Sequence, residues 1–236
     1  MGTNEKQWSS ATPGLMIILI DQSGSMLAPY EGETRTVFAT RAINRVIDEI
    51  IQKNFNGDKP KNRCFIAVIG YNQNVKELCS GWLSDLDGSP LRIETVKQRI
   101  SDGAGGLVTV DKKMPIWVEP IDQDGSTNMK EAFEKTKELC EKWITDKPQS
   151  PAPVIINISD GIPYYDGLDV ATCMNETQQV AQQIMSLSND DGNVLIFNAE
   201  IGSDAAAKLV FPSSVAELVH SDEGAKFLYN ITSVVP

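Results

Sequence analysis

The chain has 236 residues, enough for one sizeable domain or two small ones, and 41% of them are hydrophobic, enough for a buried core. Its formal net charge of −11 argues against nonspecific binding to nucleic acid or to an anionic membrane. No apolar run could span a membrane, and residues 1–13 lack the features of a secretory signal. We therefore expect a cytoplasmic protein, or one whose leader has been removed, with neither nucleic acid nor membrane as a partner.

The first strong structural signal is an unbroken apolar run over residues 15–20 that stops at Asp21. Six consecutive apolar residues are typical of a strand buried on both faces, as at the centre of a parallel sheet. In the polar loop that follows, Asp21, Ser23 and Ser25 occupy alternate positions. The ends of such strands border the crevice where open α/β sheets bind ligands, so this loop is a candidate site.

Further along the chain, apolar segments alternate with amphipathic ones. The strands predicted from apolar runs and β-branched content cover residues 15–20, 63–71, 75–83, 154–159, 193–201 and 215–219. The predicted helices cover residues 36–54, 91–100, 129–143, 170–188, 204–210 and 222–234. A tight turn makes 75–83 an antiparallel edge strand beside 63–71. The irregular stretch 101–124 predicts a hairpin or a long loop with extended arms.

This alternation predicts an α/β fold with a doubly wound, mostly parallel central sheet, one antiparallel edge strand and helices on both faces. We see no linker and no internal repeat. We therefore expect an N-terminal tail over residues 1–13 and a single domain over 14–236, with an insertion or hairpin at about 101–124. The four cysteines lack the paired spacing of a zinc site and are expected to be buried, reduced thiols.

Oxygen-bearing side chains stand at three separate junctions of the predicted elements. Asp21, Ser23 and Ser25 follow the first strand, Thr127 opens a helix, and Asp160 follows a later apolar strand. A doubly wound topology places all three junctions on the carboxyl side of the sheet. Hydroxyl and carboxylate oxygens suit a hard divalent cation. Magnesium is favoured over calcium, because the side-chain oxygens are few and waters must complete the shell.

The sequence DQSGS, followed by a helix-opening threonine and then by SDG after an apolar strand, resembles the metal-ion-dependent adhesion site (MIDAS) of von Willebrand factor A (vWA) domains. The resemblance extends from residue 15 to the C-terminus, and all five motif positions are filled. It implies that Ser23 and Ser25 bind the metal directly. It also implies that Thr127 and Asp160 bind directly or through water, and that Asp21 acts mainly through water. The implied ion is Mg²⁺, with Mn²⁺ or Ca²⁺ as alternatives.

The same resemblance implies a protein-interaction module and not an enzyme. In this family the open coordination position takes an Asp or Glu carboxylate from a partner protein, and helix and loop shifts regulate affinity. The missing signal peptide points to bacterial intracellular stand-alone members. The segment KMPIWVEPI is similar to bacterial domains associated with tellurium resistance and kinase–phosphatase systems, which suggests a stress-response or signalling complex. Because 101–124 precedes Thr127, we hypothesise that this insertion helps to select the partner.

Two other interpretations of these residues stay open. The carboxylates and hydroxyls could cap helices or form turns. Asp21, at a strand end, could instead be the nucleophile of a Mg²⁺-dependent phosphohydrolase, although such enzymes would want a second aspartate where Ser23 stands. Other enzyme classes lack their residues, since the chain has one histidine, His220, and neither a Gly-x-Ser-x-Gly elbow nor a Walker lysine.

Overall fold

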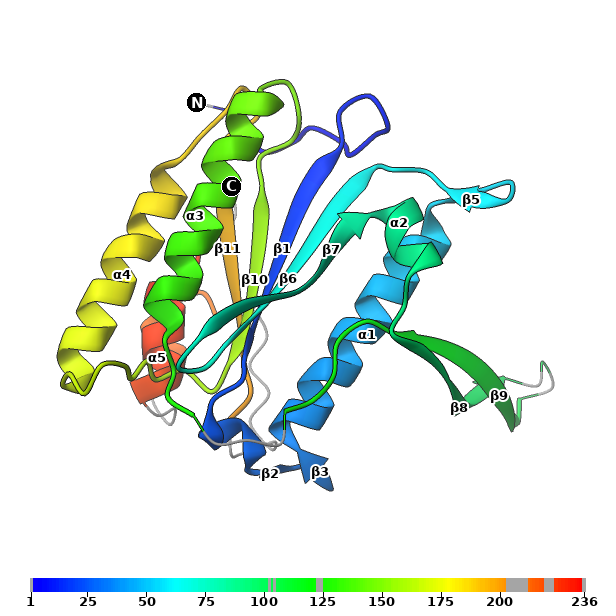
Figure 1. Ribbon diagram of the computed structural model, residues 1–236, viewed down its shortest axis with the longest axis horizontal. Helices are drawn as coiled ribbons and strands as arrows, with labels where there is room; N and C mark the ends of the chain where they lie inside the picture. Colours follow the sequence, from blue (N-terminus) through cyan, green and yellow to red (C-terminus); the bar gives the residue numbers. More distant parts are fainter. Residues whose placement is uncertain are drawn as a thin grey trace.

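The computed structural model describes residues 2–101, 103, 105–121, 125–202, 212–218 and 223–234, and a five-stranded sheet lies at its centre (Figure 1). The strands lie in the order β11 (Leu195–Glu200), β10 (Val154–Ser159), β1 (Gly14–Asp21), β6 (Cys64–Tyr71) and β7 (Val75–Trp82). All neighbours pair in parallel except β7, which runs antiparallel to β6 at one edge. The predicted sheet, including its antiparallel edge strand, is confirmed.

Helices cover both faces of the sheet (Figure 1). One face carries α1 (Arg35–Lys53) and α2 (Leu83–Gly88). The other carries α3 (Met129–Asp146), α4 (Val170–Ser186) and α5 (Glu223–Asn230). The predicted doubly wound α/β class is therefore confirmed. Among the described residues, no helix combines the length and the apolar composition needed to cross a membrane.

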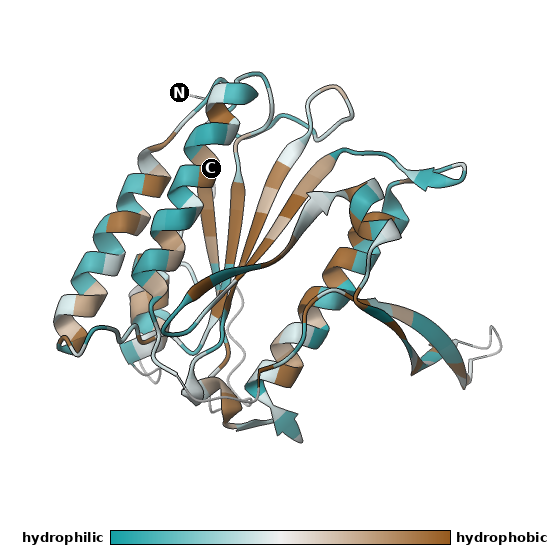
Figure 2. Ribbon diagram, viewed as in Figure 1, coloured by the Kyte–Doolittle hydropathy of each residue, from teal (hydrophilic) through white to brown (hydrophobic). Residues whose placement is uncertain are grey.

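The central strand β1 divides the core into two layers. Ile17 and Leu19 point into the cluster beneath α3, α4 and α5, whereas Ile18 and Ile20 point into the cluster beneath α1 and α2. All four side chains are buried because successive strand residues face opposite sides of a sheet that helices cover twice. Figure 2 shows this apolar concentration on the central strands and on the sheet-facing sides of the helices.

A projecting hairpin replaces the helix predicted over 91–100, and that prediction is wrong. β8 (Arg92–Ser101) pairs antiparallel with β9 (Leu107–Ile116) and extends away from the body of the molecule (Figure 1). The spacing of Ile93, Val96 and Ile100 imitates a helical face, but their β-branched side chains favour a strand once a partner strand is present. The hairpin therefore begins before the expected 101–124 segment.

Other differences lie in short elements and at the C-terminal end. Within the strand predicted over 215–219, the described residues instead form a 3₁₀ helix, η2 (Val215–Leu218), so that prediction is wrong. The helix predicted over 204–210 lies outside the described residues. Four further two-residue strands form small antiparallel pairs: β2 (Pro29–Tyr30) with β3 (Glu33–Thr34), and β4 (Phe55–Asn56) with β5 (Lys59–Pro60).

The N-terminal residues lie along the domain surface. The backbone N–H of Asn4 donates to the Asp191 carbonyl at 2.9 Å, and that of Lys6 donates to the Asp191 carboxylate at 2.9 Å. Trp8 is half-buried and packs so closely on Gly14 that a Cβ there would lie 2.3 Å from its ring. Only glycine at position 14 leaves room for the indole at the start of β1.

The four cysteines are free, and Cys64, Cys140 and Cys173 are buried as the sequence predicts, whereas Cys79 is only partly buried. Burial raises the pKa of the Cys64 and Cys140 thiols to about 12, because a buried thiolate would lose its hydration. These residues therefore act as small apolar side chains of the core.

Shortening the hairpin is expected to leave the domain folded. Replacing residues 98–110 by Asn-Gly would join Lys97 to Asp111, which face each other across the two strands. Ile100, Leu107 and Val108 are exposed, so the free energy of unfolding should change by less than about 1 kcal/mol. Urea denaturation followed by circular dichroism measures the change, and a loss of cooperative unfolding would contradict the expectation.

Replacing Gly161 by alanine should be strongly destabilising. Gly161 has a φ of +110°, and a Cβ there would lie 2.6 Å from the backbone of Gly224 in α5. We expect a loss of about 2 kcal/mol or more, because both the backbone strain and the clash must be relieved. Gly32 is the matched control, since its φ is +88° with nothing within 4 Å of the added Cβ. Equal losses of unfolding free energy in the two variants would show that the approach of α5 is unimportant.

Candidate metal centre

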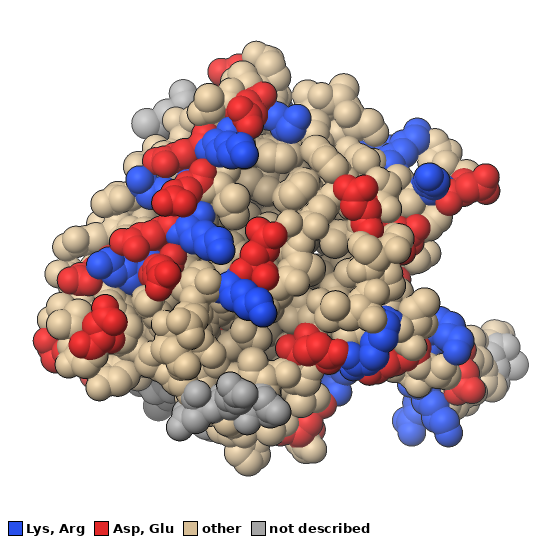
Figure 3. All heavy atoms as spheres, in the orientation of Figure 1, with Lys and Arg blue, Asp and Glu red and all other residues tan. Residues whose placement is uncertain are grey.

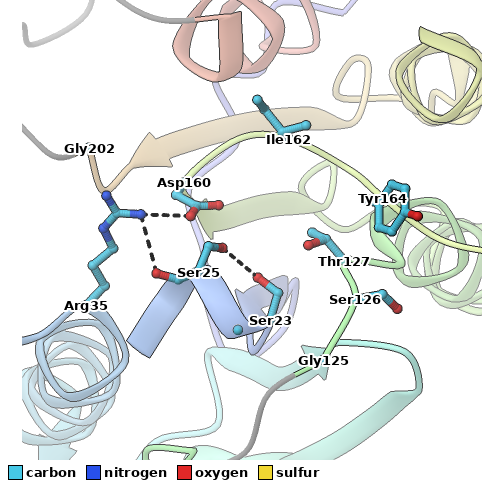
Figure 4. Close-up of a pocket in the computed structure, with 11 residues that line it drawn as sticks. Ser23, Ser25, Arg35, Gly125, Ser126, Thr127, Asp160, Ile162, Tyr164 and Gly202 are labelled. Carbon is cyan, nitrogen blue, oxygen red and sulfur yellow. Dashed lines mark hydrogen bonds and ion pairs between the residues drawn. The ribbon is translucent and has the colours of Figure 1, made fainter. Parts of the chain in front are cut away.

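A cavity of about 370 Å³ opens where the loops after β1 and β10 meet the loop before α3 (Figure 4). Four of the five predicted ligands line it: Ser23, Ser25, Thr127 and Asp160. The fifth, Asp21, is fully buried and is not among the lining residues. The topology thus brings together side chains that lie far apart in the sequence, as a doubly wound sheet does at its carboxyl end.

The loop after β1 turns into a short 3₁₀ helix, η1 (Gly24–Leu27), which Met26 anchors in the core beside α1. The hydroxyl oxygens of Ser23 and Ser25 lie 3.0 Å apart. Ser23 occupies the N-cap position of η1, but its side chain makes no capping hydrogen bond. The two hydroxyls are therefore directed toward each other and the cavity.

Backbone hydrogen bonds hold the loop before α3 against the other two loops. The Gly24 N–H donates to the Gly125 carbonyl at 3.0 Å. Thr127 and Tyr164 exchange two backbone bonds, of 2.7 and 3.0 Å. The side chain of Asn128 caps α3, so Thr127 is not the capping residue. Figure 4 shows the Thr127 hydroxyl directed into the cavity.

Asp160 faces the cavity from the end of β10, and Asp169, not Asp160, caps the following helix α4. The Oδ2 atom of Asp160 lies 2.8 Å from Nη1 of Arg35, the first residue of α1. The two side chains are only 14% and 12% exposed, respectively. The same Nη1 also donates to the Ser25 carbonyl at 3.5 Å. A guanidinium group thus links the lining carboxylate to the serine loop.

Asp21 lies behind this lining. Its Oδ1 accepts a hydrogen bond from the Ser23 N–H at 2.8 Å, and its Oδ2 accepts one from the Ser159 hydroxyl at 2.6 Å. Burial raises the pKa of Asp21 to about 6, and the negative charge of Asp160 adds to this rise, while the hydrogen bonds from Ser159 and Ser23 oppose it. Asp21 therefore supports the shape of the serine loop from inside the protein.

Two residues of the site, Arg35 and Ser159, were not predicted from the sequence. Ser159 carried a local signal, because a polar residue ends the apolar run VIINIS and is fully buried in the fold. Its hydroxyl also accepts a hydrogen bond from the Gly161 N–H at 2.9 Å. Arg35 carried no such signal, since its partner Asp160 lies 125 residues away in the sequence.

The chemistry of the lining suits a hard cation. Hydroxyl and carboxylate oxygens are the ligands that Mg²⁺ prefers. Adjacent oxygens at octahedral Mg²⁺ distances of about 2.1 Å would be about 3.0 Å apart, which agrees with the observed 3.0 Å between Ser23 and Ser25 Oγ. No group of three or more His, Cys, Asp or Glu side chains forms a metal site within the described residues. The candidate centre is instead built mainly from hydroxyls.

The sequence matches no protein-family profile and no curated protein sequence. Solved structures, in contrast, share its fold. The PilB minor pilin from Streptococcus sanguinis aligns over 93% of this chain with a TM-score of 0.50 and 10% identity. The pilus adhesin SpaC from Lactobacillus rhamnosus GG aligns over 95% with a TM-score of 0.52 and 11% identity. At these identities the likeness concerns the fold alone.

The ArnB paralog VWA2 from Sulfolobus acidocaldarius is a weaker match, with a TM-score of 0.43 and 19% identity over 84% of this chain. The chain spans 55% of PilB, 28% of SpaC and 37% of VWA2. It therefore corresponds to one part of PilB and of SpaC. What the whole proteins do is not assigned to it.

Replacing Ser159 by alanine should destabilise the protein by about 2 kcal/mol, because Asp21 and the Gly161 N–H would each lose a buried partner. The hydrogen bond from Ser159 lowers the pKa of Asp21, so in the Ser159→Ala variant the pKa of Asp21 should rise above about 6. Because the folded pKa of Asp21 lies above the ordinary aspartate value of 3.8, the stability that this group contributes falls as pH rises from that value through the folded pKa. The loss should therefore be larger at about pH 8 than at about pH 5.

Urea denaturation in EDTA at both pH values measures this loss. Ser186→Ala is the matched control, because the exposed Ser186 hydroxyl donates to the Gln183 carbonyl and not to a carboxylate. A loss independent of pH would contradict the role given to the Asp21 carboxylate.

Proposed function

We propose that the chain is a vWA-type protein-interaction module that binds a divalent cation, Mg²⁺ first, and through it an Asp or Glu side chain of a partner protein. One observation supports this most strongly. Four of the five oxygen-bearing side chains that the motif predicts converge from three separate loops on one cavity. The competing assignment to helix caps is weakened, because Asn128 and Asp169 cap the helices that Thr127 and Asp160 precede.

The proposed ligands differ in charge from those of a typical acidic metal site. Ser23, Ser25 and Thr127 offer neutral hydroxyls, and Asp160 is the one carboxylate among the described lining residues. Such a set leaves the charge of a divalent ion poorly neutralised. A bound Mg²⁺ would supply an electrophilic position where a partner carboxylate replaces water. Asp21 would act from behind, by orienting the Ser23 backbone and by contributing negative charge.

The alternative of a phosphohydrolase with Asp21 as nucleophile receives no support. Asp21 is fully buried, and both of its oxygens accept hydrogen bonds. A nucleophile must reach the phosphorus of its substrate, and this carboxylate does not face the cavity. We therefore propose a binding function without catalysis. Incubation with phosphoesters and Mg²⁺ checks this, and turnover above that of an Asp21→Asn variant would sink it.

The cellular setting rests on the sequence alone. We propose a cytoplasmic bacterial protein of a stress-response or signalling complex, on the resemblance of KMPIWVEPI to such domains. PilB and SpaC are pilus proteins, so a role in a surface structure is the competing setting. The β8–β9 hairpin is the segment that we propose for partner selection. Its shortened form should then keep Mg²⁺ binding but lose partner preference.

Metal binding is tested by isothermal titration of the purified chain with Mg²⁺. Wild type should bind, and a paired Ser23→Ala and Ser25→Ala variant should lose at least about tenfold in affinity, because two direct ligands are removed. Ser126→Ala is the matched control, since Ser126 lines the same cavity but its hydroxyl points away from Ser23 in Figure 4. Unchanged affinity in the paired variant would exclude the proposed site.

Partner binding is tested by affinity capture from the native organism with Mg²⁺ and with EDTA. The partner should be retained only with Mg²⁺, and Asp160→Ala should abolish its retention while circular dichroism shows an intact fold. Capture that persists in EDTA would refute a metal-mediated contact.

A further inference from the structure

The cavity contains a fixed positive charge besides any metal ion that it binds. Arg35 lines it from the first turn of α1, and its guanidinium contacts Asp160 and the Ser25 carbonyl (Figure 4). α1 has no acidic residue in its first turn, so the positive end of the helix dipole adds to this charge.

Arg35 is not saturated by its contacts with the protein. Its Nε is buried and has no hydrogen-bond partner among the described residues. Nη1 makes one short bond, of 2.8 Å to Asp160, and one long one, of 3.5 Å to Ser25. Leaving a buried guanidinium donor unpaired is costly, and a planar guanidinium binds carboxylates best through two donors. The group therefore has capacity for a further anion.

Two cations and one carboxylate create a competition. Asp160 is the lone carboxylate among the described lining residues, and Arg35 already holds its Oδ2. If Asp160 turns to a divalent ion, Arg35 loses its counter-charge and stands beside a second positive charge. Both effects oppose metal binding until another anion arrives. A carboxylate entering the cavity would restore the balance for Arg35 and for the ion together.

We propose that Arg35 couples metal binding to carboxylate binding. It pairs with Asp160 in the metal-free chain and with the partner's carboxylate in the loaded site, so the two ligands bind cooperatively. The metal then binds weakly alone and tightly in the presence of a partner. This inference rests on the proposed function, since it requires that the cavity bind a divalent cation.

The test is isothermal titration of Mg²⁺ into purified wild type, Arg35→Gln and Arg41→Gln, each in chloride and in acetate at equal ionic strength. Free Mg²⁺ is corrected for its acetate complex, and acetate is the probe for a carboxylate. Arg35→Gln should bind Mg²⁺ about fivefold more tightly than wild type in chloride, within the usual range of coupling between sites. Acetate should strengthen binding to wild type more than to the variant. Arg41→Gln is the matched control, because Arg41 lies on the same helix but pairs with Glu33 outside the cavity.

The outcomes separate this inference from the proposed function. No Mg²⁺ binding by wild type would remove both. If wild type binds Mg²⁺ and Arg35→Gln binds it equally or more weakly, the coupling alone is overturned. An equal effect of acetate on the two proteins would overturn it as well. If Arg35→Gln fails to fold, wild type still decides, because Mg²⁺ affinity that does not rise in acetate also overturns the coupling. Arg35→Lys, which keeps the charge, should stay within about twofold of wild type in chloride.

Discussion

The buried carboxylate of Asp21 is the interaction on which the candidate site depends. It bonds the Ser23 N–H on one side and the Ser159 hydroxyl on the other, and so joins the ends of β1 and β10. Burial raises its pKa to about 6, which means that keeping this group in the interior costs stability near neutral pH. A titratable group with a perturbed pKa beside a cavity is a recurrent feature of functional sites. Here the Asp21 carboxylate holds the serine loop in place and does not itself line the cavity.

A chain of polar side chains continues from this point across the sheet. Tyr71, which faces Asp21 in the β1–β6 register, donates to Asn157 at 2.9 Å, and Asn157 donates to Asn198 at 2.9 Å. Asn198 in turn donates to the Leu228 and Ile231 carbonyls at the end of α5, each at 3.2 Å. Buried polar groups that satisfy one another specify a single arrangement of the elements they join. This chain, together with the close approach of Gly161 to α5, sets the position of α5 relative to the site.

The three loops of the site are tied together by contacts within the protein. The backbone bonds between Gly24 and Gly125 and between Thr127 and Tyr164 hold the three loops against one another. Arg35 supplies the positive charge that keeps Asp160 in place. Preorganisation of this kind reduces the entropy that a ligand must overcome on binding.

Much of the fold could be predicted because its signals are local. The run over 15–20 gave the buried central strand, and the amphipathic pattern over 36–54 gave α1 to within a residue at each end. The prediction failed for 91–100, where Ile93, Val96 and Ile100 satisfy a helical period and a strand propensity alike. Only the pairing of β8 with β9 decides between these two conformations, and that pairing is not visible in either segment alone.

The sequence by itself determined which residues carry the oxygen atoms and at which strand and helix ends they stand, since apolar runs and polar breaks are encoded over a few residues. The tertiary structure decided how these residues are used. In the fold, four of these side chains surround one cavity: Ser23, Ser25, Thr127 and Asp160. Asp21 is buried behind that cavity, and Arg35 contacts Asp160 although the two lie 125 residues apart in the sequence. Contacts of that separation depend on how helices pack across a sheet, and this is a property of the whole fold.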